Sequence, residues 1–356
     1  MQPSIHTADH AHQAATVRAG KAGDVLAVVS QSGPTVSFFD AASDQLLDTV
    51  EVLAEPHEIC FDPTQRLLWC ASTYNSGYYN ANSGRRSEVT VIDADSRRIV
   101  EVVDLAPEHA PHGLALDPVR GRLYVSVEGS ESRPGGVVVI DTTTRRPIGR
   151  IDTGAPGPHW FVISPDGRAG YASNKEAPFV SVVDLERGEL TAKVEVPGSE
   201  GLAISADGSR VFVAAPHGAF GGRTSDDPPA GIRVIDTGTA SITGILSTEN
   251  AVLPVHVTTT GKLLVGELRV TPEGRQEAGR LTVFSVDGQE RLGSIEVGQA
   301  PLTITSSADG ALGYVSCLVS STVDVIELDT MRRLARLDIA TRGETGAHGL
   351  AYIPKA

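Results

Sequence analysis

The stretch PHGLALDPVRGRLYVSVEGSESRPGGVVVIDTTTRRPIGRIDT, residues 111–153, decides the fold. It contains four short runs rich in apolar and β-branched residues, separated by turns with glycine, proline and aspartate. The runs are GLALDP at 113–118, LYVSV at 123–127, VVVID at 137–141 and PIGRIDT at 147–153. Four antiparallel strands in one repeat of this length are typical of one blade of a β-propeller.

The third run of this unit recurs along the whole chain as a β-branched segment that usually ends in an acid. The copies are VSFFD ending at Asp40, VTVID at Asp93, VVVID at Asp141, VSVVD at Asp184, IRVID at Asp236, LTVFS at Ser285 and VDVIE at Glu327. Successive copies are 53, 48, 43, 52, 49 and 42 residues apart, close to the period of propeller blades. Seven copies predict seven blades. The recurring acid is expected to accept backbone N–H bonds in the turn that follows it.

The two ends of this region complete one blade between them. The last repeat contains a single strand, in AHGLAYIP at 347–354, whereas DVLAVVS, TVSFFD and LLDTVEV in residues 24–52 supply the second, third and fourth strands. Joining them closes the ring and covers open sheet edges. We therefore predict an all-β, seven-bladed β-propeller of four-stranded antiparallel blades over residues 20–356, as a single domain, preceded by a flexible tail over residues 1–19.

Composition narrows the range of partners and locations. The formal net charge of −14 disfavours nucleic acid or an anionic membrane as a partner. The three cysteines are an odd number at irregular positions, so no disulfide framework is expected. No apolar run reaches 18 residues, and the N-terminal stretch lacks the apolar region of a secretory signal. A cytoplasmic location is expected if these are the native first residues, and export if the sequence is a processed form.

Two repeats carry a resemblance to a known family. PHWFVISPDGRAGYASNKEAPFVSVVDLERGE at 158–189 and EGLAISADGSRVFVAAP at 200–216 resemble the YVTN-type β-propeller repeat, a family that includes proteins similar to 6-phosphogluconolactonase and streptogramin B lyase. The resemblance spans about residues 20–356 and implies the propeller fold. It does not imply one activity, because members of the family range from binding proteins to enzymes.

Histidines recur where the inner strands begin, at what we call the ring position. Blades are numbered from the repeat that contains His57. The ring position holds His57 in PHEICFDP, His112 in PHGLALDP, His159 in PHWFVISP, Glu200 in SEGLAISADG, Leu302 in blade six and His348 in AHGLAYIP, with His256 or Val255 as its equivalent in blade five. Equivalent positions of a propeller meet around its axis, and imidazole is the commonest protein ligand of divalent transition metals. A histidine after proline can also be structural, bonding a neighbouring carbonyl.

The pattern therefore predicts a site for one divalent transition metal, with Fe, Cu, Zn, Mn and Ni not distinguished. Three or four of His57, His112, His159, His256 and His348 are the expected ligands. Further candidates end the second strands on the same face or lie in the loops that follow, as general acids or bases: Tyr74, Glu128, Lys175, Glu200 and Glu267. Insertions at 72–88, 216–231 and 270–279 place long loops, typical of pocket walls, over this face.

Three functional hypotheses follow. The first is a metal-dependent enzyme acting on a small organic molecule, in which the ion is a Lewis acid or activates water or dioxygen. Lyase, hydrolase, isomerase and oxygenase reactions all remain open. The second is a metal-free, lactonase-like or lyase-like enzyme that uses histidine and glutamate as base and acid. The third is a non-catalytic propeller that binds a ligand or a protein.

Overall fold

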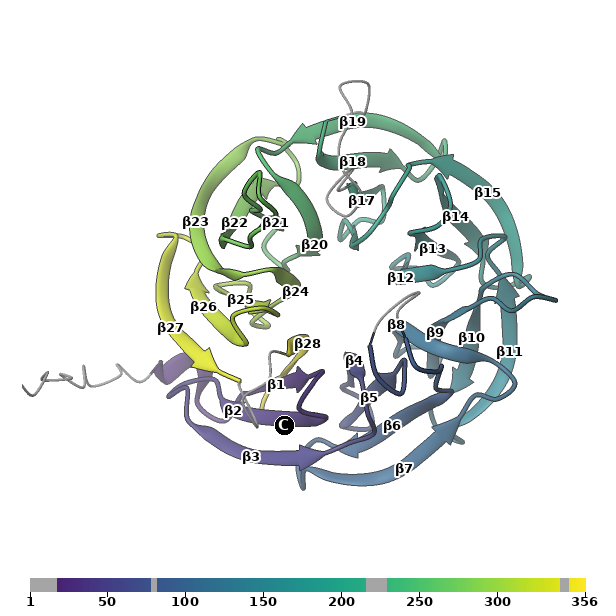
Figure 1. Ribbon diagram of the computed structural model, residues 1–356, viewed down its shortest axis with the longest axis horizontal. Coiled ribbons are helices and arrows are strands. Elements are labelled where there is room, and N and C mark those ends of the chain that lie inside the picture. The colour runs from purple at the N-terminus through teal and green to yellow at the C-terminus, as the bar shows by residue number, and fades with distance from the viewer. Residues whose placement is uncertain (1–17, 78–81, 216–228, 340–345) are drawn as a thin grey trace, which may run out of the picture.

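The protein is an all-β propeller of seven antiparallel, four-stranded sheets arranged around a common axis (Figure 1). The computed structural model describes residues 18–77, 82–215, 229–339 and 346–356. Within these ranges the helix content is a single 3-10 turn, η1 (Ala19–Lys21). The predicted fold class is therefore confirmed. In the described part of the chain, no helix has the length and apolar character needed to cross a membrane.

Six blades consist of four consecutive strands, which run in order from the axis outward. Blade one has β4 (Pro56–Asp62), β5 (Leu67–Ser72), β6 (Glu88–Asp93) and β7 (Arg98–Asp104); blade two has β8 (His109–Asp117), β9 (Arg122–Glu128), β10 (Gly136–Asp141) and β11 (Arg146–Asp152). Blade three has β12 (Pro158–Ile163), β13 (Ala169–Asn174), β14 (Phe179–Asp184) and β15 (Glu189–Glu195); blade four has β16 (Leu202–Ile204), β17 (Arg210–Ala215), β18 (Gly231–Asp236) and β19 (Ser241–Ser247). Blade five has β20 (Ala251–Val257), β21 (Lys262–Leu268), β22 (Ala278–Ser285) and β23 (Arg291–Gln299); blade six has β24 (Pro301–Ser306), β25 (Leu312–Cys317), β26 (Thr322–Glu327) and β27 (Arg332–Asp338).

Blade seven is built from both ends of the described chain, as predicted. Its strands are β28 (Ala347–Ile353), β1 (Val25–Ser30), β2 (Thr35–Asp40) and β3 (Leu46–Glu51). β28 pairs antiparallel with β1, so that Val25 lies opposite Ile353 and Val28 opposite Leu350. The hydroxyl of Tyr352 and the backbone N–H of Lys355 both donate to the carboxylate of Asp24. The ring is thus closed without a covalent link.

The acids that end the third strands have the predicted role in the turns. The Oδ1 atoms of Asp93, Asp141 and Asp184 accept backbone N–H bonds at 2.7–2.8 Å from the third residue after each. These bonds fix the tight turn from the third strand to the fourth.

The apolar core lies between neighbouring blades. Each of seven clusters in the described residues combines side chains from two adjacent sheets. Between blades seven and one, for example, Val36 and Phe38 pack with Leu68 and Ile92. Full burial of each such side chain stabilises the fold by about 1.5–3 kcal/mol. All three cysteines are free thiols, as predicted.

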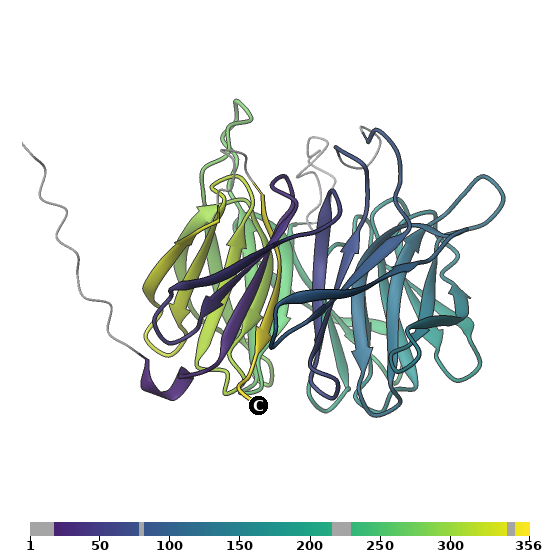
Figure 2. The ribbon, with the colours of Figure 1, turned by 90° about the horizontal axis from the view of Figure 1, so that it is seen from below.

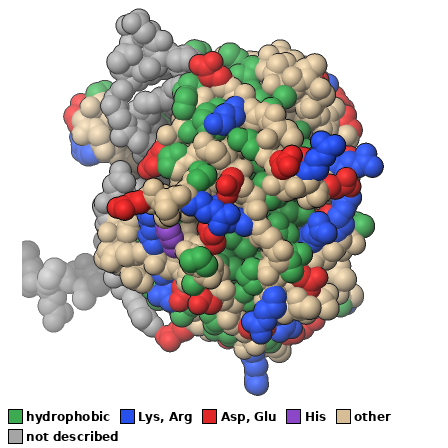
Figure 3. All heavy atoms as spheres, turned by 90° about the vertical axis from the view of Figure 1, so that its right-hand side faces the viewer, with side chains coloured by type: hydrophobic (Ala, Val, Ile, Leu, Met, Phe, Trp, Pro, Cys, Tyr) green, Lys and Arg blue, Asp and Glu red, His purple; other side chains and the backbone are tan. Residues whose placement is uncertain are grey.

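Charges of both signs cover the flank of the propeller that Figure 3 shows. Residues of neighbouring blades form ion pairs at the outer edges of the sheets. Arg145 of blade two, for example, lies 3.1 Å from Glu101 of blade one. The negative net charge is therefore not gathered into one acidic patch on this flank.

Glycine after the ring position allows neighbouring inner strands to approach closely. A Cβ added to Gly113, Gly201 or Gly349 would lie 2.4 Å from the carbonyl oxygen of His159, Leu253 or His57, respectively, in the next blade. Gly201 also donates its N–H to Leu253 O at 3.0 Å. Any larger residue would push the blades apart where the ring-position side chains meet.

We expect Gly113→Ala to lower the free energy of unfolding by about 1–3 kcal/mol, because the new methyl group has no room between blades two and three. Gly149→Ala is the matched control, since no heavy atom lies within 4 Å of its added Cβ. Denaturant unfolding of both variants measures the difference. Equal stability of the two variants would contradict the close-approach argument.

Candidate functional site

The inner strands begin at the rim above which loops rise in Figure 2, opposite the rim where the C-terminus lies. Backbone register defines the ring position in each blade. Pro56, Pro158 and Pro301 pair with Ser72, Asn174 and Cys317, the last residues of their second strands. The ring position is the next residue along the inner strand. It therefore holds His57, His159 and Leu302, as the sequence predicted.

The register corrects the prediction for blade five. Ser164 and Ser307, five residues after His159 and Leu302, donate their backbone N–H to the first residue of the second strand. Thr258 does so in blade five, so Leu253 occupies the ring position there and neither His256 nor Val255 does. The PVHV sequence resembles the PH motif of the other blades, but its Pro254 follows the ring position instead of preceding it. His256 lies three residues farther along β20, where its Nε2 is 2.9 Å from Ser306 Oγ. It lines a different cavity, together with Cys60 and Thr305.

The other four histidines do meet, and we call them the histidine cluster: His57, His112, His159 and His348. All four are buried, with 3–8% of their surface exposed. The ring centroids are 3.7 Å apart for His112 and His159, 4.6 Å for His57 and His112, and 4.7 Å for His57 and His348. Imidazoles from blades seven, one, two and three thus form a continuous arc around the axis.

Three of these rings have an oxygen beside Nδ1. His57 Nδ1 lies 3.2 Å from the carbonyl oxygen of Glu55. His159 Nδ1 lies 3.2 Å from Glu200 Oε2, and His348 Nδ1 lies 3.3 Å from Glu58 Oε1. An oxygen close to one ring nitrogen is typical of histidines that hold metals, in which a hydrogen bond at that nitrogen sets the tautomer. His348 Nδ1 lies at ion-pair distance from Glu58 without forming such a hydrogen bond in the described residues.

His112 differs from these three. Neither of its ring nitrogens has a hydrogen-bond partner in the described part of the chain, although the side chain is buried. Buried polar atoms without partners are rare in folded proteins, and each is a candidate for contact with a ligand. Both ring nitrogens of His112 therefore remain available to a ligand, as far as the described residues are concerned.

Burial keeps three rings of the cluster, His57, His112 and His348, uncharged near neutral pH. It lowers the pKa of His57 well below the usual range, with repulsion from His348 as a further cause. Burial and repulsion from His159 do the same to the pKa of His112. For His348, burial and then repulsion from His159 lower the pKa to about 3. A neutral imidazole is the form that binds metals or accepts a proton.

A buried ion pair adjoins His159. Lys175, just after β13, lies with its Nζ 3.3 Å from Glu200 Oε1. Burial alone would raise the pKa of Glu200, but Lys175 and then His159 hold it below its ordinary value. Burial lowers the pKa of Lys175, and Glu200 opposes that shift. The carboxylate is thus kept ionised at the edge of the histidine cluster.

Tyr74 and Glu128 also come to the site. The Tyr74 ring meets His57 edge to face, with centroids 6.1 Å apart, and its hydroxyl donates to Glu128 Oε1. Arg85 Nε lies 2.9 Å from the other oxygen of Glu128. Burial, and next the charge of Glu128, raise the pKa of Tyr74 above its usual range, so that the phenol stays protonated.

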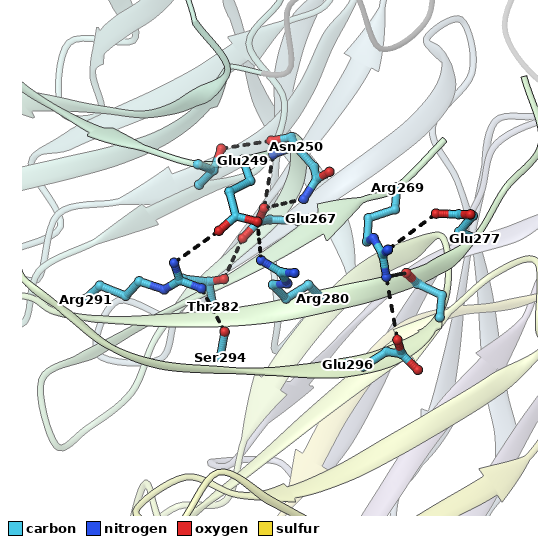
Figure 4. Close-up of polar contacts among 12 residues, drawn as sticks. Glu249, Asn250, Glu267, Arg269, Glu277, Arg280, Thr282, Arg291, Ser294 and Glu296 are labelled. Carbon is cyan, nitrogen blue, oxygen red and sulfur yellow. Dashed lines mark hydrogen bonds and ion pairs between the residues drawn. The ribbon is translucent and has the colours of Figure 1, made fainter. Parts of the chain in front are cut away.

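Glu267 is the one predicted acid or base that the structure keeps apart from the cluster. Thr282 donates to its Oε1, and Asn250 donates its backbone N–H and side-chain amide to its Oε2 at 3.2 and 2.9 Å (Figure 4). The carboxylate is buried within blade five, and these bonds occupy both of its oxygens. Glu267 therefore has a structural position, because its carboxylate accepts the hydrogen bonds that hold Asn250 in place.

Two cavities flank the histidine cluster on the loop side. The polar cavity, about 130 Å³, is lined by Arg85, Glu128, Glu176, His112 and His159 among others. The apolar cavity, about 230 Å³, extends toward blades five and six and is lined by leucines, with His57, His159 and His348 on its other side. His159 and Lys175 line both. The inserted residues 78–81 and 216–228, His217 among them, and tail residues 1–17 lie outside the described residues.

Glu58 was missed by the sequence reasoning. Its carboxyl group is buried behind His348, lies 3.4 Å from Thr303 Oγ1, and has its pKa raised by burial to about 8. The available signal was an acid directly after the histidine in an otherwise apolar inner strand, PHEICF. No three His, Cys, Asp or Glu side chains in the described ranges already stand in an arrangement that could hold a metal ion. Binding would require the imidazoles to reorient.

The fold and the site together define a seven-bladed propeller with a histidine-lined site at its axis. No family model matches the chain, so the resemblance to the YVTN repeat family stays a prediction. The chain is similar to the uncharacterized protein YncE of Salmonella typhi, with 23% identity over 222 residues, which cover 61% of this chain and 58% of YncE. YncE of Salmonella typhimurium is 24% identical over 157 residues, 42% of each chain. The chain thus spans less than two thirds of the length of either relative.

A solved structure has the same architecture. Kuenenia stuttgartiensis hydrazine synthase superposes with a TM-score of 0.67 at 15% identity, over 85% of this chain and 96% of that one. At this identity the likeness shows the propeller fold alone.

Proposed function

We propose that the protein is a metal-dependent enzyme acting on a small organic molecule, with one divalent transition metal ion bound by the histidine cluster. The observation that carries the proposal is the environment of the rings: three have an oxygen beside Nδ1, and His112 has no partner for either nitrogen in the described residues. Clustered imidazole nitrogens are the ligand chemistry that such ions prefer, and burial keeps at least His57, His112 and His348 neutral.

The ion would supply a Lewis acid or activate water or dioxygen. The chain's own groups would do the rest. The ionised Glu200 can accept a proton beside His159, and Lys175 compensates its charge. The protonated Tyr74 hydroxyl, held by Glu128, is a donor next to His57. The two cavities would bind the organic molecule on the loop side of the rings.

We expect chelator-treated protein to bind about one equivalent of at least one ion among Zn²⁺, Cu²⁺, Mn²⁺, Fe²⁺ and Ni²⁺. The variant His112→Leu should weaken that binding by about 10- to 100-fold or more, because it removes a ligand. Leucine is the matched replacement, since Leu253 and Leu302 occupy the same position in blades five and six. Calorimetric titration and elemental analysis measure both results.

His256→Leu is the control for this experiment. It makes the same substitution at a histidine that lies outside the cluster, so metal affinity should be unchanged. Less than about a tenth of an equivalent of every ion tested would overturn the proposal. Equal loss of affinity in the two variants would overturn the assignment of the ligands.

The buried group formed by Lys175, Glu200 and His159 favours a second function, metal-free acid–base catalysis of the lactonase or lyase kind. Glu200 would be the base that takes a proton from the substrate, and His159 would receive that proton and return it to the leaving group as the acid. This function predicts that turnover survives complete removal of metal and is lost in Glu200→Gln. The first function predicts that turnover is lost with the ion and returns when the ion is added back.

A further inference from the structure

The apolar cavity beside the histidine cluster has two unlike walls. Blades five and six contribute aliphatic side chains, including Leu253, Leu302 and Leu318. Trp160 and the rings of His57, His159 and His348 contribute aromatic surface. A flat apolar group between such walls can contact aliphatic groups on one side and aromatic rings on the other.

The size of the cavity limits what can enter. A cavity of about 150 Å³ lined by apolar side chains is large enough for benzene. The apolar cavity measures about 230 Å³. It therefore has room for one aromatic ring with a small substituent, but not for a long aliphatic chain.

Gln276 adds one polar atom without a partner to this cavity. Its side-chain carbonyl oxygen, Oε1, is buried and has no hydrogen-bond partner in the described residues, and Gln276 lines the apolar cavity. An acceptor left in this state favours a ligand that donates a hydrogen bond, because the unpaired oxygen is costly.

The loop that carries Gln276 is held firmly. This loop is the insertion at 270–279, and Val270 forms a β-bridge with Gln276 across its base. Gln299 Nε2 donates to the backbone carbonyl oxygen of Gln276 at 3.1 Å. Arg269 contacts Glu277 and Glu296, as Figure 4 shows, and donates to Ala278 O. The backbone that carries the acceptor is thus held in place before any ligand arrives.

We propose that the apolar cavity binds an uncharged aromatic ring whose hydroxyl group donates a hydrogen bond to Gln276 Oε1. Resting on the proposed function, this identifies the substrate class of the histidine site as phenols. The ring would lie between the leucines and Trp160, with its edge toward His57, His159 and His348. An anionic ring without a donor, such as benzoate, would leave the Gln276 oxygen unpaired.

The probes are phenol and toluene, which have the same number of heavy atoms and differ in the donor. Both are titrated into chelator-treated protein and followed by calorimetry and by the fluorescence of Trp160. The only other tryptophan, Trp69, is fully buried between blades one and two. We expect phenol to bind with a Kd of about 0.1–1 mM and about tenfold more tightly than toluene. Trp160→Phe should remove the fluorescence change.

Gln276→Leu should reduce phenol affinity about tenfold, to that of toluene, and leave toluene binding unchanged. Gln45→Leu is the matched control, because Gln45 is exposed near the outer edge of blade seven, and should bind both probes as the wild type does. Equal affinity of the wild type for phenol and toluene, no response of Trp160, or full phenol affinity in Gln276→Leu would each overturn the inference. Because no metal is present in these titrations, such a failure is separate from a failure of metal binding.

Discussion

Metal-free protein is expected to lose thermal stability steeply as the pH falls from 7 to 5. The folded state holds the pKa of His348 at about 3, and burial also places the pKa values of His57 and His112 well below the usual range. In the unfolded chain a histidine has a pKa of about 6.5. Below that pH the unfolded chain takes up protons that the folded protein cannot, so stability falls.

The size of this effect follows from proton linkage. His348 loses about 2 kcal/mol of stability between pH 6.5 and pH 5, because its folded pKa of about 3 lies below this range, and His57 and His112 lose stability in the same direction. Glu58 opposes them, because its folded pKa of about 8 exceeds the unfolded value and its contribution grows as the pH falls from 8 toward 4.5. Three histidines outweigh one glutamate, and a net loss of a few kcal/mol is expected.

Calorimetric melting at pH 5, 6, 7 and 8 in the presence of chelator measures this dependence. His112→Leu should flatten the acid side of the curve without loss of stability at pH 7, because it replaces a buried imidazole without partners in the described residues by an apolar side chain. Glu58→Gln should lower the stability less at pH 8 than at pH 5. A wild-type Tm that does not change between pH 7 and 5 would contradict the buried, neutral state of His57, His112 and His348.

A chain that ends at residue 345 is expected not to fold cooperatively. It lacks β28, and with it the buried Leu350, Tyr352 and Ile353, which contribute about 1.5–3 kcal/mol each. Losing the paired edge of β1 as well exposes backbone groups to water or to other chains. The sum rivals the whole stability of about 5–15 kcal/mol that is typical of a domain.

Near-ultraviolet circular dichroism and size-exclusion chromatography measure the result, with a loss of fixed tertiary packing and with aggregation as the expected outcome. A chain ending at Lys355 is the control, because it keeps β28 and the bond from the Lys355 N–H to Asp24 and removes only the exposed Ala356. A synthetic peptide of residues 346–356 should restore a monomeric fold by adding the missing strand. Cooperative unfolding of the shorter chain without the peptide would show that closure is dispensable.

The repeats made the fold predictable from the sequence, because each blade is set by local features: β-branched runs, turn residues and a regular period. The ring position was predictable where the motif includes the glycine or proline that shapes the strand start, as at His112 and His348. The prediction was wrong at His256, because the PVHV sequence resembles the motif but places its histidine three residues after the ring position. Gln276 could not have been found, because its role depends on how an inserted loop folds back on blades five and six.

The pairing of β28 with β1 also links assembly of the site to completion of the ring. His348 is carried by β28, which follows the strands of every other blade in chain order. A folding intermediate in which blades one to six have formed therefore has His57, His112 and His159 but lacks the fourth imidazole and the partner of Glu58. If the cluster binds an ion as proposed, propellers without blade seven would bind it weakly, and metal occupancy would measure the fraction of molecules in which the ring has closed.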